Sequence, residues 1–185
     1  ALVGRPNAGK STLFNTLLGQ RLSIVTARPQ TTRGRILGIL TRPGSQLVFL
    51  DTPGLLESSY RLHETMEQQI ERACADADAV VLLLDGTRTE DRADLVSGFL
   101  QRIRKPLLAV LNKVDRLDPE TVEPLLHRVA GDFSLSDLLP ISAVTGTNVG
   151  FLLAQLEAMA PAGPAMYPAD MVAEQPERFF AAELI

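Results

Sequence analysis

The sequence predicts an α/β fold: a mostly parallel six-stranded sheet with one antiparallel strand and with helices on both faces. Two observations predict it. Apolar runs alternate with amphipathic stretches along most of the chain, as in proteins whose parallel strands are joined by helical crossovers. Two other apolar segments, 35–41 and 46–50, are separated by only four residues, which is too short for a parallel crossover, so these strands should pair antiparallel.

The individual elements follow from the spacing of apolar residues and from the turn residues between them. The chain opens with a strand stub at 1–3, and a helix is expected from Ser11 to Leu18, closed by Gly19. After the antiparallel pair, further helices are expected at 62–75, 91–103, 120–130 and 149–159, and further strands at 80–84, 107–111 and 138–141.

Composition limits the classes of protein and of partner. The 185 residues are 45% hydrophobic and 22% charged, which is typical of one globular domain with a short tail. A net charge of −4 argues against a strongly basic surface that would hold nucleic acid. The longest apolar runs are too short to span a bilayer, so a cytoplasmic protein is expected. The single cysteine, Cys74, is expected to be a small buried hydrophobe.

A glycine-rich loop lies between the first strand and the first helix. Residues 4–11 fit the pattern G-x-x-x-x-G-K-S, and this strand-loop-helix context is the one that the pattern requires. Its glycines let backbone N–H groups point at phosphates, and the helix N-terminus adds a positive dipole. Lys10 is expected to contact the β- and γ-phosphates, and the Ser11 hydroxyl to bind Mg²⁺. The residues expected to surround the nucleotide phosphates are Asn7, Ala8, Gly9, Lys10, Ser11 and Thr12.

A second motif predicts which base is bound. Asn112, Lys113 and Asp115 form the pattern N-K-x-D after a buried strand. The Asp115 carboxylate can accept hydrogen bonds from the ring N–H and the 2-amino group of guanine, neither of which adenine offers. Two charged hydrogen bonds of roughly 1.5 to 3 kcal/mol each discriminate by about two to four orders of magnitude. GTP is therefore expected rather than ATP, and a plain helix-capping role for Asn112 and Asp115 is the alternative.

The metal site is expected to involve two more segments. Asp51 and Gly54 stand in the pattern D-x-x-G, where the aspartate should hold Mg²⁺ through water and the glycine N–H should meet the γ-phosphate. A plain turn is the alternative for this tetrapeptide. The polar stretch 30–34 should supply a threonine that completes the Mg²⁺ shell, for which Thr32 is the first candidate and Thr31 the second.

Leu55 follows Gly54 where Ras-type enzymes have a glutamine that orients the attacking water. Catalysis should therefore rest on other groups, and Asn7 is a candidate ligand for a monovalent cation. The expected catalytic residues are Lys10, Thr32, Gly54 and Asn7. An arginine acting in cis is a further candidate, from Arg28, Arg33 or Arg35.

These motifs together resemble one group of GTPases. With G-R-P-N-A-G-K-S at 4–11, T-T-R at 31–33, D-T-P-G-L at 51–55 and N-K-V-D at 112–115, the chain is similar to the TrmE-Era-EngA-YihA-Septin-like superfamily of P-loop GTPases. Within it the chain resembles the Era family, because Gly34 follows T-T-R where related families have Asp, and because there is no second phosphate loop. Ser142 and Ala143 begin a segment that resembles the S-A-x-x-G loop, whose alanine N–H meets guanine O6.

The resemblance continues into the tail. Prolines at 161, 164, 168 and 176 mark a linker, and the segment that follows it is similar to the first helix of the RNA-binding KH domain of the Era family. The expected organisation is therefore an Era-type G domain at 1–160, a linker at 161–176, and the start of a truncated C-terminal KH domain at 177–185.

The resemblance implies a Mg²⁺-dependent enzyme that hydrolyses GTP to GDP and phosphate, with potassium as an activating ion in several relatives. It implies a switch in small ribosomal subunit assembly, acting on ribosomal RNA through the absent KH domain. It also implies a monomer in the bacterial cytoplasm, with peripheral association of the parent protein with the inner membrane. The alternatives are a related GTPase of tRNA modification or large-subunit assembly, and a nucleotide-dependent binding module with negligible hydrolysis.

Overall fold

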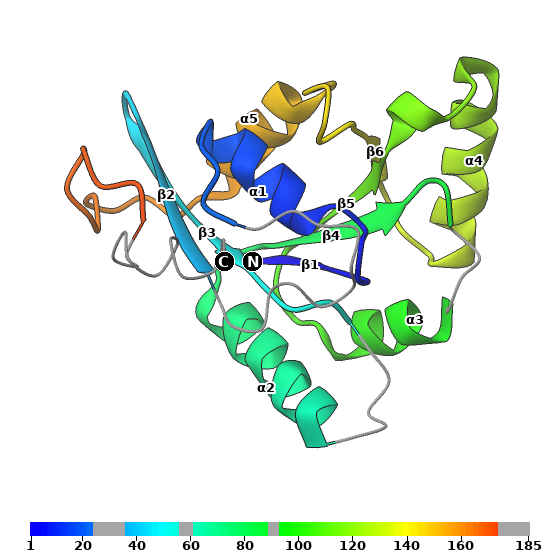
Figure 1. The fold of residues 1–185 in the computed structure, drawn as a ribbon, viewed down its shortest axis with the longest axis horizontal. Coiled ribbons are helices and arrows are strands. Elements are labelled where there is room, and N and C mark those ends of the chain that lie inside the picture. Colours follow the sequence, from blue (N-terminus) through cyan, green and yellow to red (C-terminus); the bar gives the residue numbers. More distant parts are fainter. Residues whose placement is uncertain (24–35, 56–60, 89–92, 174–185) are drawn as a thin grey trace.

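The computed structural model describes residues 1–23, 36–55, 61–88 and 93–173, and the sheet within them has the strand order β2-β3-β1-β4-β5-β6 (Figure 1). The strands are β1 (Leu2–Gly4), β2 (Ile36–Arg42), β3 (Ser45–Asp51), β4 (Val80–Asp85), β5 (Leu107–Asn112) and β6 (Leu139–Pro140). The helices are α1 (Lys10–Leu18), α2 (Arg61–Asp76), α3 (Ala93–Arg102), α4 (Pro119–Asp132) and α5 (Val149–Met159), with a 3-10 turn η1 (Val114–Arg116).

The fold class predicted from the sequence is confirmed. β2 and β3 pair antiparallel, and all the other strand pairs of the sheet are parallel. The described helices and strands match the predicted ones to within two residues at each end. The 3-10 turn η1 was not predicted, because three residues are too few to carry a periodic signal.

The sheet separates two hydrophobic clusters, and strand β4 faces both. Val81 and Leu83 pack with α1 and α5, whereas Val80, Leu82 and Leu84 pack with α2, α3 and α4. All five side chains are buried, so the strand reads as an uninterrupted apolar run. Figure 1 shows α1 and α5 on one side of the sheet and α2 and α3 on the other.

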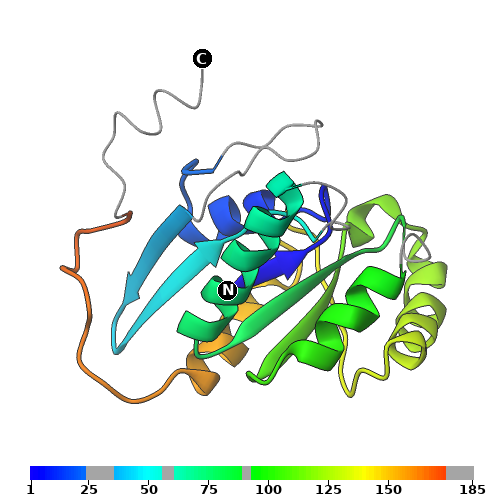
Figure 2. The same cartoon turned by 90° about the horizontal axis from the view of Figure 1, so that it is seen from below.

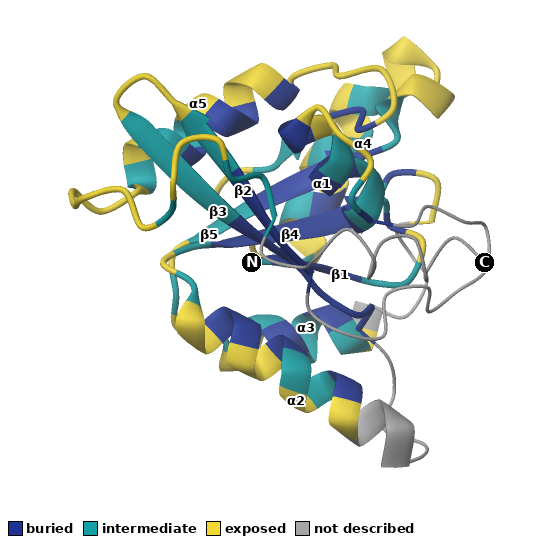
Figure 3. Cartoon of the chain, turned by 60° about the vertical axis from the view of Figure 1, so that its left-hand side comes forward, coloured by how far each residue is buried: buried dark blue, intermediate teal, exposed yellow. Residues whose placement is uncertain are grey.

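The helices turn one apolar stripe toward the sheet and expose the other side, as the burial colours in Figure 3 show. Cys74 lies on the buried stripe of α2, as predicted, and burial raises the pKa of its thiol. In the ranges that the structure describes, none of the helices combines the length and the apolarity needed to cross a bilayer.

The segment after α5 runs along the outer edge of β2 (Figure 2). The Gln46 side chain accepts hydrogen bonds from the N–H groups of Met166 and Tyr167, at 2.8 and 2.9 Å, and donates one to the Tyr167 carbonyl at 3.0 Å. The Ile39 N–H donates to the Val172 carbonyl at 2.8 Å. The described part of this segment therefore covers the edge strand of the sheet, where main-chain groups would otherwise face solvent.

Candidate functional site

The carboxyl ends of the parallel strands bring the predicted motifs to one edge of the sheet. Gly4 ends β1, Asp51 ends β3 and Asn112 ends β5, while Ser142 follows closely on β6. β1 lies between β3 and β4, where the order of the strands changes direction. Open α/β sheets bind ligands at this switch point, and the glycine-rich loop that leaves β1 lies there.

Positive φ angles shape the glycine-rich loop, at Asn7 and Gly9 as well as at Gly4. Asn7 has a φ of 62° and an exposed side chain, and Gly9, which precedes α1, has a φ of 101°. A Cβ added at Gly9 would overlap Nδ2 of Asn112, so only glycine fits here. The first turn of α1 follows at once, including Thr12, and the N–H groups of a first helical turn lack partners within the helix.

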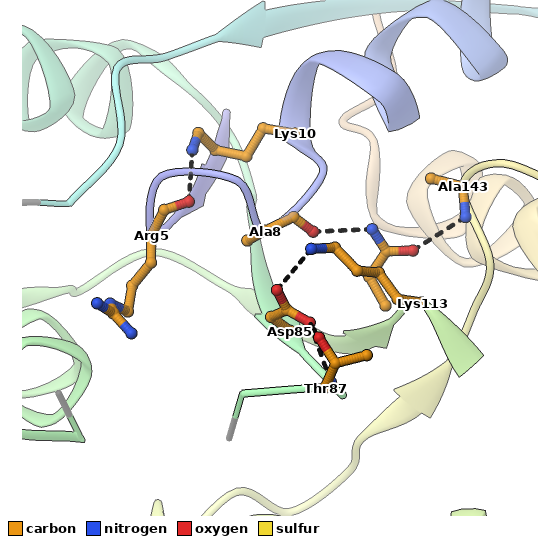
Figure 4. A network of polar contacts seen from close by, with 8 residues as sticks. Arg5, Ala8, Lys10, Asp85, Thr87, Lys113 and Ala143 are labelled. Atoms are coloured by element: carbon orange, nitrogen blue, oxygen red, sulfur yellow. Dashed lines mark hydrogen bonds and ion pairs between the residues drawn. The ribbon is translucent and has the colours of Figure 1, made fainter. Parts of the chain in front are cut away.

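Lys10 is buried inside this loop, with 6% of its surface exposed. Its ammonium donates hydrogen bonds to the carbonyls of Gly4 and Arg5, each at 3.0 Å, and Figure 4 shows the contact with Arg5. Burial lowers the pKa of Lys10 from 10.5 to about 8, against the opposing effect of the Asp51 carboxylate. The charged form therefore still prevails at neutral pH, although it is less stable than in water.

Two of the predicted metal ligands lie in contact. The Ser11 hydroxyl donates to Oδ2 of Asp51 at 2.8 Å, and the Asp51 side chain is fully buried. Hydroxyl and carboxylate oxygens are hard donors of the kind that Mg²⁺ prefers. The residues present therefore fit a magnesium ion. Thr32 and Thr31, the candidates for its remaining protein ligand, lie outside the described residues, as do Arg28, Arg33 and Arg35.

The D-x-x-G loop lies directly against the glycine-rich loop. A Cβ at Gly54 would come within 2.6 Å of the Pro6 nitrogen, and the Leu55 N–H donates to the Gly4 carbonyl at 3.0 Å. The Leu55 side chain is 6% exposed and belongs to the same cluster as Ile70 of α2. It therefore points into the core, so the position that carries a glutamine in Ras-type enzymes does not reach the site.

Asn112 ties the base-side loops to the phosphate side. Its Nδ2 donates to the Ala8 carbonyl at 2.8 Å, and its Oδ1 accepts from the Ala143 N–H at 2.9 Å; Figure 4 labels Ala8 and Ala143 and marks both contacts with dashed lines. The Asn112 side chain is 2% exposed. The resemblance assigned the Ala143 N–H to guanine O6, whereas in the structure it donates to Asn112.

Asp115 and Ser142 form a second contact between the base-side loops. The Ser142 hydroxyl donates to Oδ1 of Asp115 at 2.6 Å and accepts from the Thr145 N–H at 3.1 Å. Ser142 is fully buried, whereas Asp115 is exposed at the sheet edge. Ser142, expected to contact the nucleotide, therefore acts in this arrangement by orienting the Asp115 carboxylate.

Lys113 has a partner that sequence reasoning missed. Its Nζ lies 2.5 Å from Oδ2 of Asp85, at the end of β4, and its backbone has a φ of 69° (Figure 4). Burial raises the pKa of Asp85, but hydrogen bonds from Lys113 and Thr87 outweigh it and hold this pKa below its usual range. A lysine in the left-handed region is uncommon and is found where surrounding structure enforces it.

Thr16 is another residue that the sequence motifs do not contain. Its hydroxyl donates to the Ala143 carbonyl at 2.7 Å, which links helix α1 to the loop after β6. A signal for it does exist in the sequence, because Thr16 lies one helical turn beyond Thr12 on the helix that the glycine-rich loop begins. Its partner, 127 residues away, could not be read from spacing.

The fold and the loops define a class of protein. A six-stranded sheet with one antiparallel hairpin, whose switch point carries the loop G-x-x-x-x-G-K-S, is the G domain of P-loop GTPases. The sequence model of the family described as 50S ribosome-binding GTPase matches residues 1–113, more than half of the chain. The chain belongs to this family, and within it to the Era-like G domains.

Curated relatives and solved structures agree with this assignment. The chain is 40% identical, over all 185 residues, to GTPase Era of Lactobacillus delbrueckii subsp. bulgaricus and to GTPase Era of Clostridium botulinum, and it spans 62% of the length of each. A solved structure of Era with MgGDPNP and nucleotides 1506–1542 of 16S ribosomal RNA is 35% identical, with a TM-score of 0.92 over 99% of this chain and 63% of that one. An Aquifex aeolicus Era variant bound to GDP.AlF4- has a TM-score of 0.91 and the same identity and coverage.

Proposed function

We propose that this chain binds GTP and GDP and hydrolyses GTP to GDP and phosphate in the presence of Mg²⁺. The observation that carries the proposal is the pair of contacts of Asn112, which holds the base-side loops on the glycine-rich loop. Because these contacts hold the loops together, one nucleotide can place its phosphates on the glycine-rich loop and its base on the loops around Asp115 and Ser142. The family to which the chain belongs and the MgGDPNP in the related Era structure support this reading.

Guanine is selected by Asp115. Its carboxylate accepts one hydrogen bond from Ser142, which fixes its orientation and leaves acceptor capacity at the exposed edge. The ring N–H and the 2-amino group of guanine supply two donors for it. Adenine supplies neither, so the carboxylate would lose hydrogen bonds without replacement when ATP is bound.

The phosphates are held by Lys10 and by the N-terminus of α1. In the chain the Lys10 ammonium donates to two neutral carbonyls, whereas a phosphate would give it a charged and therefore stronger acceptor. Ser11 and Asp51, together with Thr32, would hold Mg²⁺, which when bound neutralises charge on the phosphoryl oxygens. Gly54 lies against Pro6 of the glycine-rich loop, where its N–H is proposed to meet the γ-phosphate.

Position 55 carries a leucine whose side chain is buried in the core. Hydrolysis therefore proceeds without the glutamine that Ras-type enzymes have at this position. We propose slow turnover that depends on Lys10, Thr32 and Gly54 and that potassium accelerates through the exposed Asn7. Hydrolysis should therefore be faster in KCl than in NaCl, measured as phosphate release at equal ionic strength, and Asn7→Ala should remove the difference. Equal rates in the two salts, unaffected by Asn7→Ala, would exclude this role of Asn7.

The proposal extends to ribosome assembly through a second domain. We propose that residues 1–160 form the G domain, that 161–176 lead out of it and that 177–185 begin a KH domain that binds small-subunit ribosomal RNA. The 16S ribosomal RNA in the related Era structure supports this, as does the greater length of the relatives. The family description names the 50S particle, so large-subunit assembly is the second candidate. We place the protein in the bacterial cytoplasm as a monomer, with peripheral contact to the inner membrane outside the G domain.

A fusion protein tests whether a second domain binds small-subunit ribosomal RNA under the control of the bound nucleotide. This chain alone should not retain nucleotides 1506–1542 of 16S ribosomal RNA in a filter-binding assay, because its net charge of −4 disfavours contact with RNA phosphates. A fusion to the remaining part of the Lactobacillus relative should retain this RNA, and more of it with GDPNP than with GDP. Equal retention of the RNA with GDPNP and with GDP would show that the nucleotide does not control RNA binding.

The nucleotide specificity has a direct test in the affinities of the chain for GTP and ATP. GTP should bind about two to four orders of magnitude more tightly. Asp115→Asn should weaken GTP and improve xanthosine triphosphate, whose base presents an acceptor where guanine has its amino group. Asp118→Asn is the matched control, because Asp118 caps α4 through the Glu120 N–H and asparagine caps helices equally well. Equal affinities for GTP and ATP would refute the proposal.

A further inference from the structure

A serine outside the motifs contacts the proposed magnesium carboxylate. The Ser23 hydroxyl donates to Oδ2 of Asp51 at 2.7 Å, and the Ser11 hydroxyl donates to the same oxygen at 2.8 Å. Asp51 is fully buried and Ser23 is 5% exposed. Hydrogen bonds from hydroxyls to an ionised carboxylate are short and strong, and they gain strength away from water.

The position of Ser23 is fixed by helix α1. Oδ1 of Asn15 accepts from the N–H groups of Leu22 and Ser23, at 3.0 and 2.9 Å, and Nδ2 of Asn15 donates to the Ser23 carbonyl at 2.8 Å. Asn15 lies on the same helix as Ser11. One rigid element therefore places both hydroxyls on Asp51, the first directly and the second through the Asn15 amide.

We propose that Ser23 is a positioning residue for magnesium, holding the Asp51 carboxylate in the orientation in which it serves the metal. This rests on the proposed function, in which Ser11 and Asp51 take part in holding Mg²⁺. With Mg²⁺ bound, the Ser11 hydroxyl would serve both the carboxylate and the metal, whereas the Ser23 hydroxyl donates to Asp51. Without Ser23, the buried Asp51 carboxylate would lose a donor that fixes it against rotation.

The test is the magnesium dependence of GDP retention. The release of a fluorescent GDP analogue, mant-GDP, is followed by stopped flow at increasing free Mg²⁺, starting from excess EDTA. In the unchanged chain Mg²⁺ should slow release. Ser23→Ala should raise the Mg²⁺ concentration at half effect by about tenfold, the equivalent of one charged hydrogen bond, and should leave release in EDTA unchanged. Ser23→Thr, which keeps the hydroxyl, should restore the half-effect concentration to near that of the unchanged chain.

Ser45→Ala is the matched control. Ser45 also donates to a carboxylate at 2.8 Å, that of Glu157, but at the far end of the β2–β3 hairpin, so its loss should leave the Mg²⁺ half-effect concentration unchanged. If Ser23→Ala does not fold, Asn15→Asp replaces it, because this change keeps the acceptor but removes the donor to the Ser23 carbonyl. It should raise the half-effect concentration severalfold.

The outcomes separate the two proposals. The role of Ser23 is overturned if Ser23→Ala, or Asn15→Asp in its place, has the same half-effect concentration as Ser45→Ala. It is also overturned if Ser23→Ala speeds release equally in EDTA and in Mg²⁺, which is the sign of a purely structural role. If the unchanged chain releases mant-GDP at one rate with and without Mg²⁺, the proposed magnesium site itself fails.

Discussion

The base side and the phosphate side of the site are built differently. On the base side, hydrogen bonds join separate loops of the chain: Asn112 joins Ala8 to Ala143, and Ser142 holds Asp115. On the phosphate side, the Lys10 ammonium donates to carbonyls of its own loop, which are contacts that phosphates can replace. Changes on the base side should therefore alter stability and affinity together, whereas a change at Lys10 should alter affinity alone or in the opposite direction to stability.

The largest effect is expected for Asn112→Ala on the base side. The change leaves the buried Ala8 carbonyl and Ala143 N–H without their partner, at about 1 to 3 kcal/mol for each group. We expect the free energy of unfolding to fall by about 2 to 6 kcal/mol, and GTP affinity to fall with it. Urea unfolding of the nucleotide-free chain measures the first and titration calorimetry the second. Unchanged stability of Asn112→Ala would show that Asn112 does not hold the base-side loops together.

Lys10→Met, on the phosphate side, should lower GTP affinity without lowering the free energy of unfolding. It removes the cation that meets the phosphates, so GTP affinity should fall by about a hundredfold, the equivalent of one or two charged hydrogen bonds. Because it also removes a buried ammonium, the nucleotide-free chain at pH 7 should be at least as stable as the unchanged chain. Urea unfolding measures the stability and titration calorimetry measures the GTP affinity. A Lys10→Met chain that lost as much stability as Asn112→Ala would show that Lys10 is a structural residue.

The titration of Lys10 should make both stability and GTP affinity depend on pH, in opposite directions. Burial lowers the pKa of Lys10 in the folded chain from 10.5 to about 8, so between these values the unfolded chain binds more protons. The free energy of unfolding should therefore gain a contribution that rises with pH across this window, seen as the difference between the unchanged chain and Lys10→Met. GTP affinity should fall above pH 8, by up to about tenfold per unit, since phosphates bind the charged ammonium. An affinity that is flat from pH 7 to 9.5 would contradict this.

The smallest effect is expected for Thr16→Val on the base side. The valine keeps the shape of the side chain but loses the hydrogen bond to the Ala143 carbonyl. A neutral hydrogen bond contributes about 0.5 to 1.5 kcal/mol, so GTP affinity should fall by a factor of about two to ten, with a similar loss of stability. Thr121→Val is a control for loss of a hydroxyl, because the Thr121 hydroxyl donates to the nearby Asp118 carbonyl, three residues back along the chain. Equal GTP affinity of the two variants would assign Thr16 no part in the site.

Prediction from sequence succeeded where signals are local. The loop at 4–11 and the pattern at 112–115 each follow a strand, and parallel strands bring their carboxyl ends to one edge. The partners of Asn112 were not predicted, since Ala8 lies 104 residues away and no periodicity marks such a pair. Asp85 and Ser23 were missed for the same reason.

The segment after α5 shows a second kind of limit. Its composition predicts a linker, yet its main-chain groups bond to the Gln46 side chain on β3 and to the Ile39 N–H on the edge strand β2. Backbone hydrogen bonds to an edge strand do not need a particular side-chain pattern, so the sequence carries little sign of them. Two apolar side chains of this segment, Tyr167 and Met171, pack against the core beneath this edge.

The most direct test is amide hydrogen exchange at Ala143 in the nucleotide-free chain, followed by NMR. If the base side is assembled by the protein itself, the Ala143 N–H is bonded to Asn112 before any nucleotide arrives. It should then exchange slowly without nucleotide, and quickly in Asn112→Ala. Fast exchange that slows only when GDP is added would contradict this account, because the nucleotide and not Asn112 would then be assembling the base side.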